Sequence, residues 1–148
     1  MPSPRKSSPR NSGSRKSGPR KSGPRKSAPR SGDFHRSGCP IASTLDLVGD
    51  RWSLVVVRDM INGKRRFGEL LAGPEGIPTN ILADRLRRLE AHGLVRKEPY
   101  QERPRRNAYV LTERGAGLHP ILQAICRWGN AHIPNTWIPP DAFMAPVD

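Results

Sequence analysis

The stretch TNILADRLRRLEAHGLVRKEPYQERPRRNAYVL, residues 79–111, decides which fold the chain is expected to adopt. Its first part predicts a helix from about residue 80 to residue 92, because leucines recur there with the spacing of one helix face. These leucines are Leu82, Leu86 and Leu89. Thr79 is expected to be the N-cap of the helix, and Gly93 is expected to end it.

The second part of the stretch predicts a β-hairpin. Two short segments of strand-forming residues, about residues 94–100 and 108–111, flank a basic loop that holds Arg103, Arg105 and Arg106. A helix with one apolar face, followed directly by such a hairpin, is typical of the winged helix-turn-helix fold.

The residues before this stretch predict three more helices. The first begins near Pro40 and stops at Gly49, and the second lies within residues 51–62 and is apolar on two faces. A short third helix from about Phe67 is expected to end at the Gly- and Pro-rich residues 73–78. The expected fold class is therefore mainly α with a small β-hairpin wing.

The residues after the hairpin predict one long helix that Thr112 opens. Its apolar stripe continues farther than a small wing domain needs for its own core, so we expect this stripe to form a dimer interface. The expected interface residues are Leu118, Leu122, Ile125 and Trp128. The DNA-binding and dimerisation domain then covers residues 37–133, and residues 134–148 form a Pro-rich C-terminal arm.

Residues 1–36 form a Pro-Arg-Lys-Ser repeat. They hold 11 Lys and Arg and one Asp, so ten of the chain's thirteen net positive charges lie there and three remain for residues 37–148. Recurrent proline, glycine and like charge predict a disordered tail that adds non-specific affinity for DNA. An amphipathic transit peptide is not expected, because the repeat is almost free of apolar side chains.

Nothing in the sequence predicts a membrane protein. The longest aliphatic run, residues 54–57, is far shorter than the roughly 20 residues of a membrane-spanning helix. We therefore expect a cytoplasmic, nucleoid-associated protein. The two cysteines and four histidines are scattered, so no metal site or cofactor is expected.

The predicted basic helix is the element expected to contact DNA. Its leucine face packs on the core, so Asn80, Asp84, Arg87 and Arg88 turn outward on a helix about 18 Å long, which fits a major groove. Arginines near the hairpin are expected to reach phosphates or the minor groove. The full set of expected DNA-binding residues is Arg65, Arg66, Thr79, Asn80, Ile81, Arg85, Arg87, Arg88, Arg103, Arg105 and Arg106. The alternative for the helix alone is a solvated charged face.

Three stretches together resemble the HxlR-type transcriptional regulators, a branch of the winged-helix regulators related to the MarR group. They are CPIASTLDLVGDRWSLVVVRDMINGKRRFGELL, IPTNILADRLRRLEAHGLVRK and YVLTERG, within about residues 39–128. The resemblance implies a bacterial homodimer on palindromic operator DNA, with a recognition helix at 79–91 and a wing at 100–109. Many members open that helix with Ser-Pro-Arg, whereas this chain has Pro78-Thr79-Asn80.

Cys39 matches the N-terminal cysteine that some members of this family use as a thiol sensor. A thiol at the start of a helix is activated by its position, and the alternative is a small side chain that only packs. Cys126 is expected to pack. An oxidant, an electrophile or a small molecule is therefore a candidate effector.

The function expected from these features is that of a sequence-specific transcriptional regulator, with repression as its expected action. The main alternative is an architectural, sequence-neutral protein that compacts the nucleoid, because a winged helix with a basic tail also suits that role. An enzyme is not expected, since no nucleophile and base or paired carboxylates occur at usable spacing. RNA binding by the tail stays open.

Overall fold

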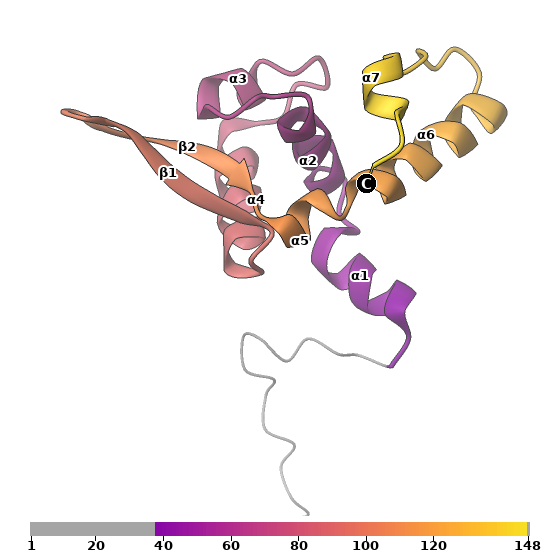
Figure 1. Ribbon diagram of the computed structural model, residues 1–148, viewed down its shortest axis with the longest axis horizontal. Coiled ribbons are helices and arrows are strands. Elements are labelled where there is room, and N and C mark those ends of the chain that lie inside the picture. Colours follow the sequence, from indigo (N-terminus) through magenta and orange to yellow (C-terminus); the bar gives the residue numbers. More distant parts are fainter. Residues whose placement is uncertain (1–37, 148) are drawn as a thin grey trace, which may run out of the picture.

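The computed structural model describes residues 38–147, so the predictions for the tail, residues 1–36, lie outside the described residues. Seven helices and one two-stranded antiparallel sheet occupy the described part. They are α1 (Pro40–Val48), α2 (Ser53–Ile61), α3 (Phe67–Leu71), α4 (Thr79–Ala91), β1 (Val95–Glu102), β2 (Arg105–Leu111), α5 (Glu113–Ala116), α6 (His119–His132) and α7 (Asp141–Met144). This order of four helices, a hairpin and three further helices is that of a winged helix-turn-helix (Figure 1).

The predicted leucine stripe of α4 is confirmed. Leu82, Leu86 and Leu89 are at most 1 % exposed and form the centre of the core together with Val57 of α2. Gly93 adopts a φ of 68° directly after the helix, which is the left-handed conformation that favours glycine at a helix end. Thr79 is not the N-cap, however, because the helix already begins at Thr79 and Pro78 precedes it.

The hairpin is longer than predicted. The two strands pair in register from Val95 with Leu111 to Glu102 with Arg105, with a bulge between Pro99 and Gln101. The predicted basic loop is therefore reduced to a tight turn at Arg103-Pro104, and the other loop residues belong to the strands. The hairpin projects away from the helices in Figure 1, with α4 behind its base.

The predicted single long helix after the hairpin is wrong, because the chain forms α5 and then α6. Thr112 does open α5, and its hydroxyl accepts a hydrogen bond from the backbone N–H of Gly115 (3.1 Å). The break follows from Pro120, which suits only the first turn of a new helix. A Cβ at Gly115 would lie 2.0 Å from the Leu94 carbonyl oxygen, so α5 can approach β1 this closely only with glycine there.

The Pro-rich C-terminal arm packs against α6. Phe143 of α7 is 4 % exposed, and its carbonyl oxygen accepts hydrogen bonds from Gln123 Nε2 (2.9 Å) and lies 2.7 Å from His119 Nε2. Pro140 precedes α7 and is its N-cap. The apolar pair Phe143-Met144 behind two prolines was the available signal for this element, which the sequence analysis did not predict.

Candidate nucleic-acid interface

The exposed face of α4 begins at its N-terminus. Thr79 and Asn80 are exposed in the first turn, where backbone N–H groups have no partner within the helix. Ile81 is half-buried and packs partly against the core, so part of its side chain stays exposed. Such a helix start provides N–H donors and polar side chains that suit phosphate oxygens or base edges.

Farther along α4, the two outward arginines differ in exposure. Arg87 is 75 % exposed and pairs with Asp84 one turn earlier, whereas Arg88 is only half-buried at the edge of the face. An i,i+3 ion pair between exposed residues is weak, so Arg87 can leave Asp84 for a DNA contact at little cost in free energy. Arg87 is therefore the arginine of α4 that is best placed for a base edge.

Arg85, one of the predicted DNA-binding residues, makes an ion pair within the protein. Its side chain is only 17 % exposed, and its Nε lies 3.2 Å from Asp50 Oδ1, in the turn before α2. The same carboxylate accepts hydrogen bonds from the backbone N–H groups of Trp52 (2.9 Å) and Ser53 (3.0 Å). Arg85 thus ties α4 to the start of α2, and we leave it out of the candidate surface.

The environment of Asp50 favours its charged form. Burial raises the pKa of this carboxyl, but hydrogen bonds from the Ser53 hydroxyl and from the Trp52 and Ser53 backbone, with the charge of Arg85, hold the pKa below its ordinary value. An Asp three residues before Ser53, at the start of an apolar helix, was the sequence signal for this role. It was missed.

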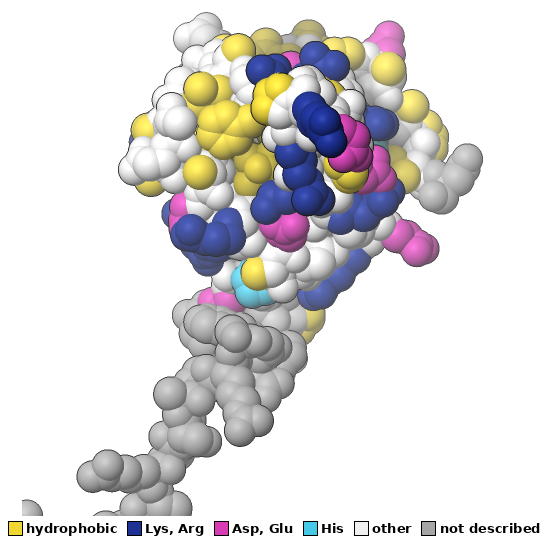
Figure 2. Space-filling view, turned by 90° about the vertical axis from the view of Figure 1, so that its left-hand side faces the viewer, with side chains coloured by type: hydrophobic (Ala, Val, Ile, Leu, Met, Phe, Trp, Pro, Cys, Tyr) yellow, Lys and Arg dark blue, Asp and Glu magenta, His cyan; other side chains and the backbone are white. Residues whose placement is uncertain are grey.

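The wing arginines lie at the far end of the hairpin. Arg103, Arg105 and Arg106 are all exposed, the first in the turn and the other two in β2. Figure 2 looks onto the face from which the hairpin projects, and Lys and Arg side chains gather around it there, with some Asp and Glu among them. A protruding strand pair with such side chains suits phosphates or a minor groove beside a major-groove helix.

Arg65 and Arg66 connect α3 to the wing. The carbonyl oxygen of Arg65 accepts a hydrogen bond from the Tyr109 N–H of β2 (2.7 Å), and the Arg66 guanidinium lies 4.8 Å from the ring centre of Tyr100. Glu69 accepts hydrogen bonds from the backbone N–H groups of Arg65 and Arg66, both 2.9 Å, and these two bonds lower the pKa of Glu69. Tyr100 was missed as part of this surface because aromatic character alone indicates packing equally well.

Further bonds hold the wing at a fixed distance from α4. Lys97 of β1 pairs with Glu90 of α4 (2.8 Å), a hydrogen bond that raises the pKa of Lys97. At the end of α4, Arg114 Nη1 donates to the His92 carbonyl oxygen (2.9 Å) and Thr112 Oγ1 donates to that of Gly93 (2.6 Å). The candidate surface is therefore a helix and a wing in one rigid arrangement.

The predicted dimer residues separate into two groups. Leu118 and Leu122 are 8 % and 6 % exposed and belong to the protomer's own core, so they offer little surface to a partner. Ile125 and Trp128 are exposed by 47 % and 61 %, and Ile121 of the same helix by 43 %. Of the predicted interface residues, Ile125 and Trp128 therefore remain accessible to a partner.

Cys39 lies at the start of α1 and is exposed. In Figure 1, α1 lies apart from the other helices, and its side chains Ile41 and Leu45 are exposed by 70 % and 55 %. Cys126 is half-buried on α6, and no disulfide joins these two cysteines. Position and exposure thus leave the thiol of Cys39 accessible to a reagent.

Within residues 38–147, no group of His, Cys, Asp or Glu is arranged to hold a metal ion. No helix in the same described range is long and apolar enough to cross a membrane.

Comparison with known proteins agrees with this geometry. The sequence profile of the HxlR-like helix-turn-helix family matches residues 47–136. The HTH-type transcriptional regulator sll1512 of Synechocystis is 41 % identical over 92 residues, which are 62 % of this chain and 68 % of that protein. Among solved structures, PA1607, assigned as a transcription factor, is 40 % identical to this chain, with a TM-score of 0.62. The alignment covers 69 % of this chain and 72 % of the PA1607 chain.

The redox regulator HypR in its oxidized form is 38 % identical to the chain, with a TM-score of 0.58. The alignment covers 64 % of this chain and 97 % of HypR. Residues 47–136, which the family profile matches, include α2, the whole of α4, both strands of the wing and α6. The chain therefore belongs to the HxlR-like helix-turn-helix family and is a DNA-binding transcriptional regulator of the helix-turn-helix type.

Proposed function

We propose that two copies of this chain bind a palindromic operator as a homodimer and repress the adjacent gene. The observation that carries this proposal is the division of α4 into a fully buried leucine stripe and an exposed face with Thr79, Asn80 and Arg87. A helix seated in this way presents side chains to a major groove, while the wing arginines reach the flanking phosphates or minor groove.

The homodimer is supported by exposed apolar side chains on two helices. Ile41 and Leu45 of α1, and Ile121, Ile125 and Trp128 of α6, are each more than 40 % exposed. Apolar side chains of this size are costly to leave in water when they gather on one element. In a homodimer, burial of these faces would place two α4 helices on successive half-sites of one operator.

The basic tail contributes affinity in this proposal and the domain contributes selection. Residues 1–36 carry net charge +10, so they attract any phosphate backbone regardless of base sequence. Residues 37–148 carry only +3, so their share of DNA binding depends more on contacts of defined geometry. Repression follows if the dimer covers a promoter.

The proposal is tested by selecting bound fragments from random duplex DNA with the full chain, and by footprinting the protein across a bacterial genome. A regulator yields short palindromes with two equal half-sites. Broad coverage without a shared motif would assign the chain to the architectural class instead. A reporter gene placed behind a recovered palindrome should lose expression when the chain is produced, whereas a rise in expression would contradict repression.

A further inference from the structure

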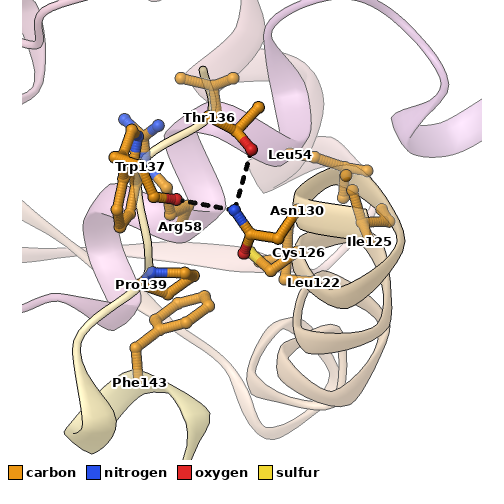
Figure 3. Close-up of a pocket in the computed structure, with 12 residues that line it drawn as sticks. Leu54, Arg58, Leu122, Ile125, Cys126, Asn130, Thr136, Trp137, Pro139 and Phe143 are labelled. Atoms are coloured by element: carbon orange, nitrogen blue, oxygen red, sulfur yellow. Dashed lines mark hydrogen bonds between the residues drawn. The ribbon is translucent and has the colours of Figure 1, made fainter. Parts of the chain in front are cut away.

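A cavity of about 270 Å³ lies between α2, α6 and the C-terminal arm (Figure 3). Its walls are mainly apolar side chains, among them Leu54 of α2, Leu122, Ile125 and Cys126 of α6, and Trp137 and Phe143 of the arm. Pro139 and Phe143 are buried, and Gln123 holds the arm through its bonds to the carbonyl oxygens of Phe143 and Ala145 (2.9 and 2.7 Å). The chain thus builds this cavity from its own three segments.

The charged group beside the cavity is already neutralised. Arg58 lines the wall, and its Nη2 donates to Asp59 Oδ1 (2.7 Å) and Glu75 Oε2 (3.0 Å). Lys64 pairs with the second oxygen of Asp59 (2.8 Å), so two cations face two carboxylates. A charged ligand would lose its hydration without gaining a counter-charge, and the cavity therefore favours an uncharged molecule.

The side chain of Asn130, an exposed residue on the wall, holds an atom that can accept a hydrogen bond from a ligand. Asn130 Nδ2 donates to Thr136 Oγ1 and to the Trp137 carbonyl oxygen, both at 2.9 Å, so both of its hydrogens are used. The opposite orientation of the Asn130 amide would place its Oδ1 against the Trp137 carbonyl oxygen, and two acceptors repel each other. Oδ1 is therefore the amide atom that is left to accept a further hydrogen bond. Within the described residues this oxygen accepts no hydrogen bond, so it suits a ligand that brings a donor.

The size of the cavity limits the ligand further. A cavity of about 150 Å³ holds benzene, so about 270 Å³ suits a molecule with two fused rings. We propose that this cavity binds a small, uncharged, mainly apolar molecule of about that size with one hydrogen-bond donor directed at Asn130. The ligand fills space that would otherwise leave the surrounding apolar side chains without contacts.

The cavity also has a physical connection to the DNA-binding surface. Arg58 lies on its wall and pairs with Glu75, which belongs to the turn between α3 and α4. A ligand that shifts Arg58 therefore acts on the residues that set the start of α4. This consequence, a changed affinity for operator DNA, rests on the proposed function, whereas binding of the ligand does not.

Gly129 offers a variant that fills the cavity. It lies on the wall within α6, and a Cβ built on it would meet no atom within 4 Å. Gly129→Leu replaces a poor helix former by a good one, so the helix should form at least as well. Ala131→Leu adds the same side chain at an exposed position two residues further along α6 and is the matched control.

The test titrates the full chain with indole by calorimetry in the absence of DNA. Indole should bind the wild type and Ala131→Leu alike, and its affinity for Gly129→Leu should fall at least tenfold. Indene, which has the same shape without the N–H donor, and indole-2-carboxylate, which is charged, should both bind at least fivefold more weakly than indole. Failure of indole to bind the wild type, or equal binding to both leucine variants, would overturn the proposal.

A second measurement does not depend on the Gly129 variant. In a Cys39→Ser background, indole should slow alkylation of Cys126 by iodoacetamide, because Cys126 lies on the cavity wall. An unchanged rate at an indole concentration that saturates the protein would place the ligand elsewhere. Loss of the dimer in Gly129→Leu but not in Ala131→Leu would show that a second copy fills the cavity, and this too would overturn the proposal.

The regulatory consequence is measured last, as operator affinity with and without saturating indole. A change of threefold or more is expected. Indole that binds while operator affinity stays constant would overturn the regulatory step alone. A chain that binds indole but selects no operator would instead contradict the proposed function and leave the ligand site supported.

Discussion

The ion pair between Asp50 and Arg85 should contribute measurably to folding, although it lies outside the candidate DNA surface. Asp50→Ala removes a carboxylate that accepts two backbone N–H groups at the start of α2 and also faces Arg85 at 3.2 Å. Loss of the helix-end acceptor costs about 1 kcal/mol. Loss of the partner of a largely buried guanidinium adds about 1–2 kcal/mol, less than for a fully buried pair because both groups keep some contact with water.

We therefore expect the free energy of unfolding to fall by about 2–3 kcal/mol in Asp50→Ala. Asp50→Ser keeps an acceptor for the helix start and should lose only about 1–2 kcal/mol, as should Arg85→Met. Urea denaturation of the full chain, followed by far-UV circular dichroism at one protein concentration, measures these values. The double variant Asp50→Ser/Arg85→Met should lose less than the sum of the two single losses.

The same contribution depends on pH in a defined direction. The folded-state pKa of Asp50 lies below its ordinary value, so the stabilisation is complete above the unfolded-state pKa of about 4 and is lost as the pH falls through the folded-state pKa. The stability of wild type and Asp50→Ser should therefore converge in acid. Additive losses in the double variant, or a constant difference between pH 7 and pH 3, would refute the tie between α2 and α4.

Five other changes test the DNA contacts, the dimer face, the thiol and the tail. In competition binding, Arg87→Ala should weaken operator binding by about 1–3 kcal/mol and binding to random DNA by less. Arg105→Ala should weaken binding to both DNAs about equally. Identical behaviour of the two variants would contradict the placement of α4. Trp128→Glu should give a monomer by light scattering with much weaker operator binding, and an intact dimer would exclude this face. Peroxide should release wild type but not Cys39→Ser from DNA, and equal release would assign Cys39 to packing. Deletion of residues 2–32 should flatten the slope of log affinity against log salt by about 4–5 units, and an unchanged slope would mean that the tail does not contact DNA.

The elements were predictable where one local pattern decides them. The leucine spacing located α4 because a helix with that stripe has only one way to bury it, and Gly93 marked its end through a conformation that glycine favours. The break at Pro120 was also visible in the sequence, but the apolar stripe on both sides of it favoured a continuous helix. Pro120 decides because it leaves the carbonyl of Ala116 without a partner in any continuous helix.

The roles of individual side chains were less predictable, because they depend on partners that are distant in the sequence. Arg85 and Arg87 are both arginines of α4 and lie two residues apart. Arg85 nevertheless pairs with Asp50, which precedes α2, whereas Arg87 is exposed. Leu122 and Ile125 similarly share one stripe, yet Leu122 belongs to the core and Ile125 is exposed. The spacing of residues along one helix predicts the direction in which a side chain points. It does not predict which residue of another element that side chain contacts.

The hairpin is joined to the rest of the domain at both its base and its side. The Tyr109 N–H bonds to Arg65, Lys97 pairs with Glu90, and α5 lies against the start of β1 at Gly115. These contacts restrain the wing relative to α4, so we expect the two elements to keep a nearly constant separation. In operator DNA, the number of base pairs between the groove positions that helix and wing touch should then be constant, and variation among operators should be confined to the distance between half-sites.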